Sequence, residues 1–132
     1  DAYALLGGIA TYREDPEDTI PLLREALRIN PSAGYLYFLL LARAYYFLGD
    51  YEQAHINLSE ALNRNPENLE SHLYLAATLL NLDRADEAEW EAMEVLGLEP
   101  NFSLGVWSET YPMNKGGQLD RFLADLRLVG FT

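Results

Sequence analysis

The side chains best suited to acid–base or metal chemistry are the two histidines, His55 and His72. Neither belongs to a pair of ligands at metal-binding spacing on one helix face. The chain has no cysteine, which excludes a thiolate zinc site, a thiol nucleophile and a disulfide framework. Ser71 precedes His72, but a catalytic triad depends on spatial geometry and not on adjacency in the sequence. We therefore expect both histidines to have structural or surface roles.

Carboxylates form the second group of candidate residues, and they are concentrated in one stretch: Asp86, Glu87, Glu89, Glu91 and Glu94. Such a run suggests paired catalytic carboxylates or a calcium site. Calcium loops use flexible, oxygen-rich turns that contain glycine, whereas this run has a helical pattern. We expect a solvated helix face.

Two glycine pairs, Gly7-Gly8 and Gly116-Gly117, could suggest a phosphate-binding loop. Both lack the Lys-Ser/Thr sequence or the strand-then-helix context that such loops require. Since no stretch of the sequence supports catalysis, we predict that the chain is not an enzyme. We also predict that it has no catalytic residue, metal site or cofactor.

Composition limits the remaining classes. The 132 residues are 49 % hydrophobic, which is enough for one folded domain over residues 1–132. The formal net charge of -12 disfavours a nucleic acid partner, because phosphate backbones would be repelled. No apolar run has the length of about 18–20 residues that a membrane helix needs. The chain begins at Asp1 without a signal-peptide pattern, so we expect an excerpt or a processed form, and we favour a cytoplasmic location.

The elements that must position any functional side chain are helices, and residues 35–66 show this best. Apolar residues recur there at steps of three and four in two runs: Phe38, Leu41, Ala42 and Tyr45, then Ala54, Leu58, Ala61 and Leu62. Gly49 and Asp50 separate the runs, and Pro66 ends the second. This pattern predicts two antiparallel helices joined by a tight turn. We expect the small residue Ala42 to lie at a close contact between helices.

The two-helix unit is repeated along the chain. Residues 24–31 and 59–66 match closely, and residues 93–100 form a weaker third copy. The prolines at positions 31, 66 and 100 lie 35 and 34 residues apart. Thr19, Ala54 and Ala88 keep the same spacing in the second helices, as do Gly7, Ala42 and Ala76 in the first. Three copies therefore run in phase over both helices.

This pattern resembles the tetratricopeptide repeat, in which an aromatic residue, a Leu-small pair and a Tyr precede an Ala, a large apolar residue, an Ala and a Pro. The resemblance implies an all-α superhelix of three helix pairs, at about residues 1–34, 35–68 and 69–102. Residues 103–132 would form a capping segment with a short helix ending near Pro112 and a final helix over residues 119–129. This tail, with Trp107, also resembles the C-terminal repeat regions of bacterial nucleotidyl cyclases and winged-helix regulators.

In this family the first helix of each repeat lines a concave groove. Transferred by spacing, the resemblance implies a partner-binding groove formed by Leu36, Leu39, Leu40, Arg43, Tyr46, Phe47, Leu73, Tyr74, Ala77 and Asn81. The first repeat would add Ala4, Leu5, Gly8, Thr11 and Tyr12. Family members that bind chaperone tails hold a terminal carboxylate with Lys, Asn and Arg. Here Ala4, Gly8, Leu40, Glu70 and Tyr74 stand at those positions, which disfavours such a ligand.

We therefore interpret the chain as a protein-interaction module whose partner is an apolar or basic peptide or protein surface. The alternative is the regulatory or dimerisation end of a larger bacterial signalling protein. An uncovered groove would be a larger apolar patch than soluble monomers usually expose, so we expect a cover. The final helix could turn back over the groove, or two copies could form a homodimer. We favour the homodimer, because the final helix is already needed to cap the third repeat.

Overall fold

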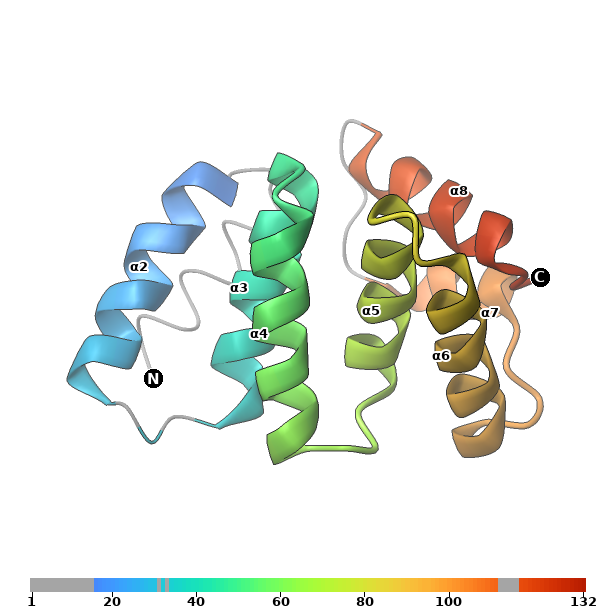
Figure 1. Ribbon diagram of the computed structural model, residues 1–132, viewed down its shortest axis with the longest axis horizontal. Coiled ribbons are helices and arrows are strands. Elements are labelled where there is room, and N and C mark those ends of the chain that lie inside the picture. The colour runs from blue at the N-terminus through green and yellow to red at the C-terminus, as the bar shows by residue number, and fades with distance from the viewer. Residues whose placement is uncertain (1–15, 31, 33, 112–116) are drawn as a thin grey trace.

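The computed structural model describes residues 16–30, 32, 34–111 and 117–132, and within these ranges it is helical without strands (Figure 1). The helices are α2 (Pro16–Ile29), α3 (Tyr35–Leu48), α4 (Tyr51–Arg64), α5 (Leu69–Asn81), α6 (Ala85–Leu98), α7 (Leu104–Thr110) and α8 (Gln118–Val129). The predicted all-α class is confirmed. The longest of these helices has 14 residues, which is too short to cross a bilayer.

The helices pair as the repeat pattern predicts. α3 packs against α4 and α5 against α6, and these two pairs occupy the second and third predicted repeats (Figure 1). α2 packs on α3 as the second helix of the first repeat. The predicted first helix of that repeat, with Ala4, Leu5, Gly8, Thr11 and Tyr12, lies outside the described residues. The extent of the domain, residues 1–132, stays a prediction.

The small residues that recur in phase are buried in the helix stack. Ala42 and Ala76 are fully buried in the first helices of their repeats. Thr19, Ala54 and Ala88, which share one position in three second helices, are also buried. A larger side chain at these contacts would push the helices apart at a cost of about 1–3 kcal/mol. The in-phase spacing of small residues therefore corresponds to the helix interfaces of the stack.

The turns between paired helices have matching backbone geometry. Gly49 ends α3 with φ 83°, and Asp83, 34 positions later, follows α5 with φ 60°. Glycine adopts this left-handed conformation without strain, and Asp is one of the few other residues that tolerate it. Asp50 then caps α4 by accepting a hydrogen bond from the backbone N–H of Gln53. The loss of the turn glycine in the third repeat thus leaves the turn intact.

The capping segment folds back on the third repeat. α7 ends before Pro112 and α8 covers the residues expected to form the final helix, as predicted. The backbone N–H of Leu104, at the start of α7, donates to the carbonyl of Thr132 at 2.8 Å. Phe131 packs edge-on against Phe102, with ring centroids 5.5 Å apart. These contacts hold the C-terminus beside the beginning of α7.

Candidate functional site

The predicted groove is mostly covered by the chain itself. Of its ten predicted residues, eight have at most 9 % of their surface exposed: Leu39, Leu40, Arg43, Tyr46, Phe47, Leu73, Tyr74 and Ala77. Leu36, at the beginning of α3, is 47 % exposed, and Asn81, at the end of α5, is also exposed. The structure therefore brings the predicted set together on α3 and α5 but leaves little of it open.

Aromatic rings from the capping segment fill the centre of the groove. Phe122 of α8 stacks on Tyr74, with ring centroids 4.1 Å apart and planes 10° from parallel. It also meets the ring of Tyr46 edge-on at 5.7 Å. Trp107 of α7 approaches the other edge of Phe122, with centroids 6.0 Å apart. Offset stacking and edge-on contacts of this kind add about 0.5–1.5 kcal/mol each beyond the burial of area.

Polar contacts fix the position of α8 over this aromatic cluster. The Tyr46 hydroxyl donates a short hydrogen bond to the carboxylate of Asp125. Asn81 donates its side-chain N–H to the same carboxylate oxygen at 2.9 Å. Burial raises the pKa of Tyr46 well above its usual value, and the neighbouring Asp125 raises it further, so this hydroxyl remains a donor. The contacts specify one placement of α8.

Arg121 joins α8 to the end of α3. Its guanidinium donates to the carbonyl oxygens of Tyr46 and Phe47, each at 3.2 Å, and to the hydroxyl of Tyr51. The last turn of α3 contains no basic residue of its own. A cation near the last carbonyls of a helix interacts favourably with the negative end of its dipole. Arg121 therefore supplies the charge that α3 lacks.

A buried ion pair lies deeper in the groove. Arg43 is fully buried, and its guanidinium donates to the Glu70 carboxylate at 2.7 Å and to the Tyr111 hydroxyl oxygen at 3.1 Å. Tyr111 donates to the same Glu70 oxygen at 2.7 Å, so Tyr74, 2.8 Å away, is the donor in the Tyr74–Tyr111 pair. Burial raises the pKa of Tyr111 well above its usual value. This network connects α3, α5 and the end of α7.

The expectation that one final helix could not serve both surfaces is wrong. α8 packs against α5 and α6 as a cap, and it also reaches α3 through Asp125 and Arg121. α8 can contact both surfaces because different side chains make the contacts. Phe122, Leu123 and Leu126 are buried, while Arg121 and Asp125 bond to α3. The groove is covered within one chain, and the reason for favouring a homodimer no longer holds. Self-association itself stays a prediction.

Sequence reasoning did not identify Arg121, Phe122, Asp125 and Tyr111 as groove residues. Their spacing contains a signal, because Arg121, Phe122 and Asp125 lie three and four positions apart and share one helix face. That face combines an aromatic ring with one positive and one negative charge. A helix that serves only as an apolar cap does not need charged residues on its packed face. Tyr111 follows α7 and has no periodic signal.

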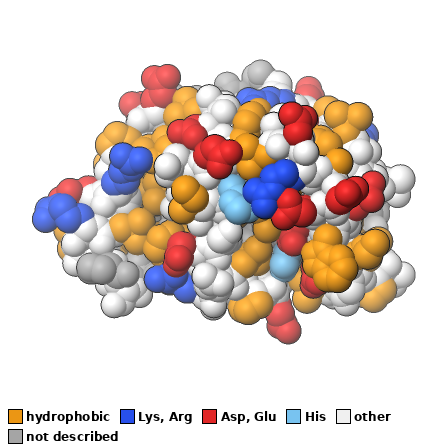
Figure 2. All heavy atoms as spheres, viewed as in Figure 1, with side chains coloured by type: hydrophobic (Ala, Val, Ile, Leu, Met, Phe, Trp, Pro, Cys, Tyr) orange, Lys and Arg blue, Asp and Glu red, His pale blue; other side chains and the backbone are white. Residues whose placement is uncertain are grey.

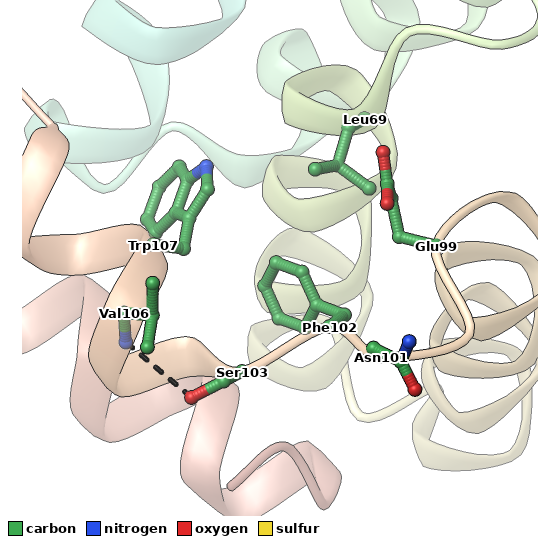
Figure 3. A pocket seen from close by; sticks show the side chains of 7 residues that line it. All are labelled: Leu69, Glu99, Asn101, Phe102, Ser103, Val106 and Trp107. Atoms are coloured by element: carbon green, nitrogen blue, oxygen red, sulfur yellow. Dashed lines mark hydrogen bonds between the residues drawn. The ribbon is translucent and has the colours of Figure 1, made fainter.

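An open hollow lies at the beginning of α5, and none of the ten predicted groove residues lines it. This hollow of about 310 Å³ lies where α5 begins and α7 passes, and seven residues line it: Leu69, Glu99, Asn101, Phe102, Ser103, Val106 and Trp107 (Figure 3). Val106 is 63 % exposed, and Figure 3 shows Phe102 between Trp107 and Val106 on one side and Glu99 and Asn101 on the other. Its volume is near the lower end of the range for ligand sites, about 300–1,000 Å³.

The candidate residues for chemistry have structural partners. The ring nitrogens of His72 lie 2.7 Å from a Glu91 carboxylate oxygen and 2.7 Å from the carbonyl oxygen of Pro66. The backbone N–H and the hydroxyl of Ser71 both donate to Asn68, at the beginning of α5. Within the part of the chain that the structure describes, no group of three or more His, Asp or Glu side chains could hold a metal ion.

Comparisons with known proteins agree with this architecture. The family model described as "Anaphase-promoting complex, cyclosome, subunit 3" matches residues 14–91, more than half of the chain. The tetratricopeptide domain of Arabidopsis OM64 is similar, with a TM-score of 0.72 and 21 % identity over 96 % of this chain and 93 % of that one. The first such domain of human RPAP3 has a TM-score of 0.70 and 18 % identity, with the same coverage. At these identities the likeness concerns the fold alone. No curated protein matches the chain.

Proposed function

The chain belongs to the family described as anaphase-promoting complex, cyclosome, subunit 3, with repeats of the tetratricopeptide type, and from this membership we propose that the chain binds a peptide segment of a partner protein. The fold is that of a protein-interaction module in general. The finer proposal concerns which surface is used. Because α7 and α8 cover the groove, in this proposal the peptide contacts the open hollow at the beginning of α5, beside Leu69 and Trp107.

The observation that supports this proposal is the hollow itself, which combines apolar walls with a few polar groups. Phe102, Val106 and Trp107 offer apolar surface, while Glu99 and Asn101 stand at its edge (Figure 3). Binding sites for small ligands and side chains have this composition. Leu36 adds exposed apolar surface at the beginning of α3, on the same edge of the helix stack as the beginning of α5 (Figure 1).

The chemistry of the partner follows from these surfaces. An apolar side chain would enter the hollow, because its walls lose contact with water when it is filled. A basic group next to that side chain would face Glu99, and the net charge of -12 favours it further. In this proposal Leu36 and the hollow form the contact surface. The buried members of the predicted groove, such as Leu40, Arg43 and Tyr74, are not part of this surface.

The two tryptophans allow a direct test, because Trp107 lines the hollow and Trp90 lies on another helix. A Trp90→Phe background leaves Trp107 as the sole tryptophan reporter. Peptides would be selected from a displayed random library against the 132-residue chain, and their dissociation constants measured by Trp107 fluorescence. We expect selected peptides to contain an apolar residue beside a basic one.

Matched variants locate the contact. Leu36→Glu and Val106→Glu should each weaken binding at least about tenfold, because a carboxylate would be placed against an apolar side chain. Ile29→Glu, an equally exposed apolar position at the end of α2, should change binding by less than about twofold. If Ile29→Glu weakens binding as much as the other two variants, or if Val106→Glu has no effect, the hollow at the beginning of α5 is not the site.

A further inference from the structure

The outward face of α6 exposes large apolar side chains. Trp90 is 61 % exposed and Met93 is 64 % exposed. Successive helical residues turn by about 100°, so Trp90, Met93 and Gly97 lie within about 60° of one another on this face. Leu96, 47 % exposed, extends the apolar surface to one side. In Figure 2 hydrophobic side chains gather over α6. We call Trp90, Met93 and Gly97 the α6 face.

Single exposed apolar residues are common on protein surfaces, but an adjacent Trp and Met on one helix are different. Trp is among the residues most enriched at the centres of protein interfaces, and Met adapts its shape to a partner. Both lie opposite the side of α6 that packs toward the core, where Ala88 and Val95 are buried.

Gly97 adds an independent observation. A glycine near the end of a helix costs up to about 1 kcal/mol relative to Ala. Gly97 has no positive φ angle that would require glycine, and a Cβ added there would meet nothing within 4 Å. The monomer therefore gives no reason for a glycine at this position. A flat spot beside Trp90 and Met93 would let the backbone of a partner helix approach closely.

Carboxylates surround the α6 face. α6 contains five acidic residues and neither Lys nor Arg. Two of these carboxylates are paired, Glu87 with Arg84 and Glu91 with His72. No ion pair is recorded for the other three among the described residues: Asp86, Glu89 and Glu94. By helical angle, Glu94 borders the α6 face on one side and Glu89 on the other, and Figure 2 shows acidic side chains around the hydrophobic ones.

A hollow of about 480 Å³ at the beginning of α6 continues this surface, lined by residues 83–87. Its lining includes Asp83, Asp86 and Glu87, with Arg84 as the one basic member. A long basic side chain would fit here, since its alkyl stem can lie along Ala85 while its charge faces the carboxylates.

We propose that the α6 face docks a basic amphipathic helix of a partner protein. Its apolar side chains would cover Trp90 and Met93, its backbone would approach Gly97, and its Lys or Arg residues would face Glu89 and Glu94. Charge selects this occupant over two others. A second copy of the chain would bring carboxylates against carboxylates, and an anionic membrane surface would be repelled for the same reason. The surface is separate from the groove, so this proposal does not depend on the proposed function.

The test uses two peptides of about 18 residues, or five helical turns. The first has Leu and Lys at the spacing of an amphipathic helix, and the second has Glu in place of every Lys. The 132-residue chain carries Trp107→Phe, so Trp90 is the sole tryptophan reporter. We expect the Lys peptide to bind, shift Trp90 emission to shorter wavelength and dissociate as salt rises from about 50 to about 500 mM. The Glu peptide should not bind.

Paired charge variants separate a specific site from general acidity. In the Trp107→Phe background, Glu89→Lys combined with Glu94→Lys should weaken Lys-peptide binding at least about tenfold. Glu67→Lys combined with Glu109→Lys makes the same change in net charge on exposed residues outside α6 and should weaken it by less than about threefold. Equal effects of the two pairs, or equal binding of the two peptides, would overturn the proposal.

A further variant tests the apolar part, with binding followed by calorimetry and the fold by circular dichroism. Trp90→Ala should leave the helical signal unchanged and weaken Lys-peptide binding at least about tenfold, whereas Ile29→Ala should have little effect. Sedimentation of the unmodified chain tests the competing occupant. A dimer that Trp90→Ala dissociates would show that a second copy covers the α6 face, and the proposal would be wrong.

Discussion

The concave side of α3 and the outward side of α6 both carry large apolar side chains, but the first is buried and the second is exposed. Over α3, Phe122 and Trp107 complete an aromatic cluster, and Arg121 and Asp125 hold α8 in one position. Over α6, Trp90 and Met93 remain in solvent inside a rim of carboxylates. Burial of the first surface stabilises the fold, while most of the second remains exposed. This difference is the basis of our proposal that the second surface contacts a partner.

The largest expected effect comes from removing the Phe122 ring, which covers the groove. Phe122→Ala should lower the free energy of unfolding by about 3–5 kcal/mol, because it leaves a cavity between Tyr46 and Tyr74. Urea denaturation followed by circular dichroism measures it. Leu128→Ala, at an exposed position on the same helix, is the control and should change stability by less than about 0.5 kcal/mol.

The same measurement on the α6 face should show almost no change in stability. Trp90→Ala removes a larger side chain than Phe122→Ala but should change the free energy of unfolding by less than about 0.5 kcal/mol. A loss comparable to that of Phe122→Ala would mean that Trp90 supports the fold and that the two surfaces do not differ.

A second, smaller effect is expected in the buried network of the groove. Glu70→Gln removes the charge opposite Arg43 while keeping a hydrogen-bonding side chain of similar size. We expect a loss of about 1.5–3 kcal/mol, the usual range for a hydrogen bond to a charged group. Glu60→Gln, which alters an exposed ion pair with Arg64, is the matched control and should cost less than about 1 kcal/mol. Equal losses in urea denaturation would contradict a special role for the buried pair.

Gly97→Ala tests whether the folded chain itself needs glycine on the α6 face. It should stabilise the isolated chain by up to about 1 kcal/mol, because Ala is the better helix former and the added methyl meets no atom. Thermal denaturation measures the gain. A destabilised variant would show that the glycine is required by the monomer itself.

The smallest effect concerns His72, which connects α5 to the carboxylates of α6. Burial alone lowers the pKa of His72, but hydrogen bonds to Glu91 and to the carbonyl of Pro66, with the charges of Glu91 and Glu94, raise it overall. Because both ring nitrogens face acceptors, the doubly protonated ring fits best. Its contribution to stability is complete below the ordinary value of 6.5 and is lost as pH rises through the raised pKa of the folded state.

The variant His72→Gln should therefore cost more stability at about pH 6 than at about pH 8. Denaturation of the parent and the variant at both values measures this difference, in which the other titrating groups cancel. His55→Gln serves as the control for the loss of a histidine. An equal cost of His72→Gln at both pH values would contradict a contribution from the charged ring.

Periodicity was sufficient to predict the helix pairs, because each repeat places small residues such as Ala42 and Ala76 at the same helix contact. The assignment of residues of α3 and α5 to a shared concave side rests on helical spacing and stays a prediction. Periodicity could not predict that Arg43 would be fully buried in an ion pair. Its partners include Tyr111, whose placement is set by tertiary contacts and not by a repeat.

The α6 face escaped the sequence analysis for a related reason. Asp86, Glu87, Glu89 and Glu94 of the acidic run are exposed, whereas Glu91 is mostly buried against His72. The sequence analysis did not assign Trp90 and Met93 to the exposed face. The signal was present, because Ala88 and Val95 define the buried side of α6 and place Trp90 opposite to it. A helix whose apolar residues occupy both sides has more hydrophobic surface than its fold needs.

The hydrogen bond between Tyr46 and Asp125 joins residues 79 positions apart. In a plain stack of repeats each unit contacts its neighbours alone, so terminal units can unravel one at a time. α8 contacts the third repeat and also bonds to the end of α3 in the second, so it connects the two repeats directly. Opening the third repeat then requires α8 to release α3 as well. The amide protons of α3 and α5 would consequently exchange with solvent through one shared opening event, where a plain stack would show two.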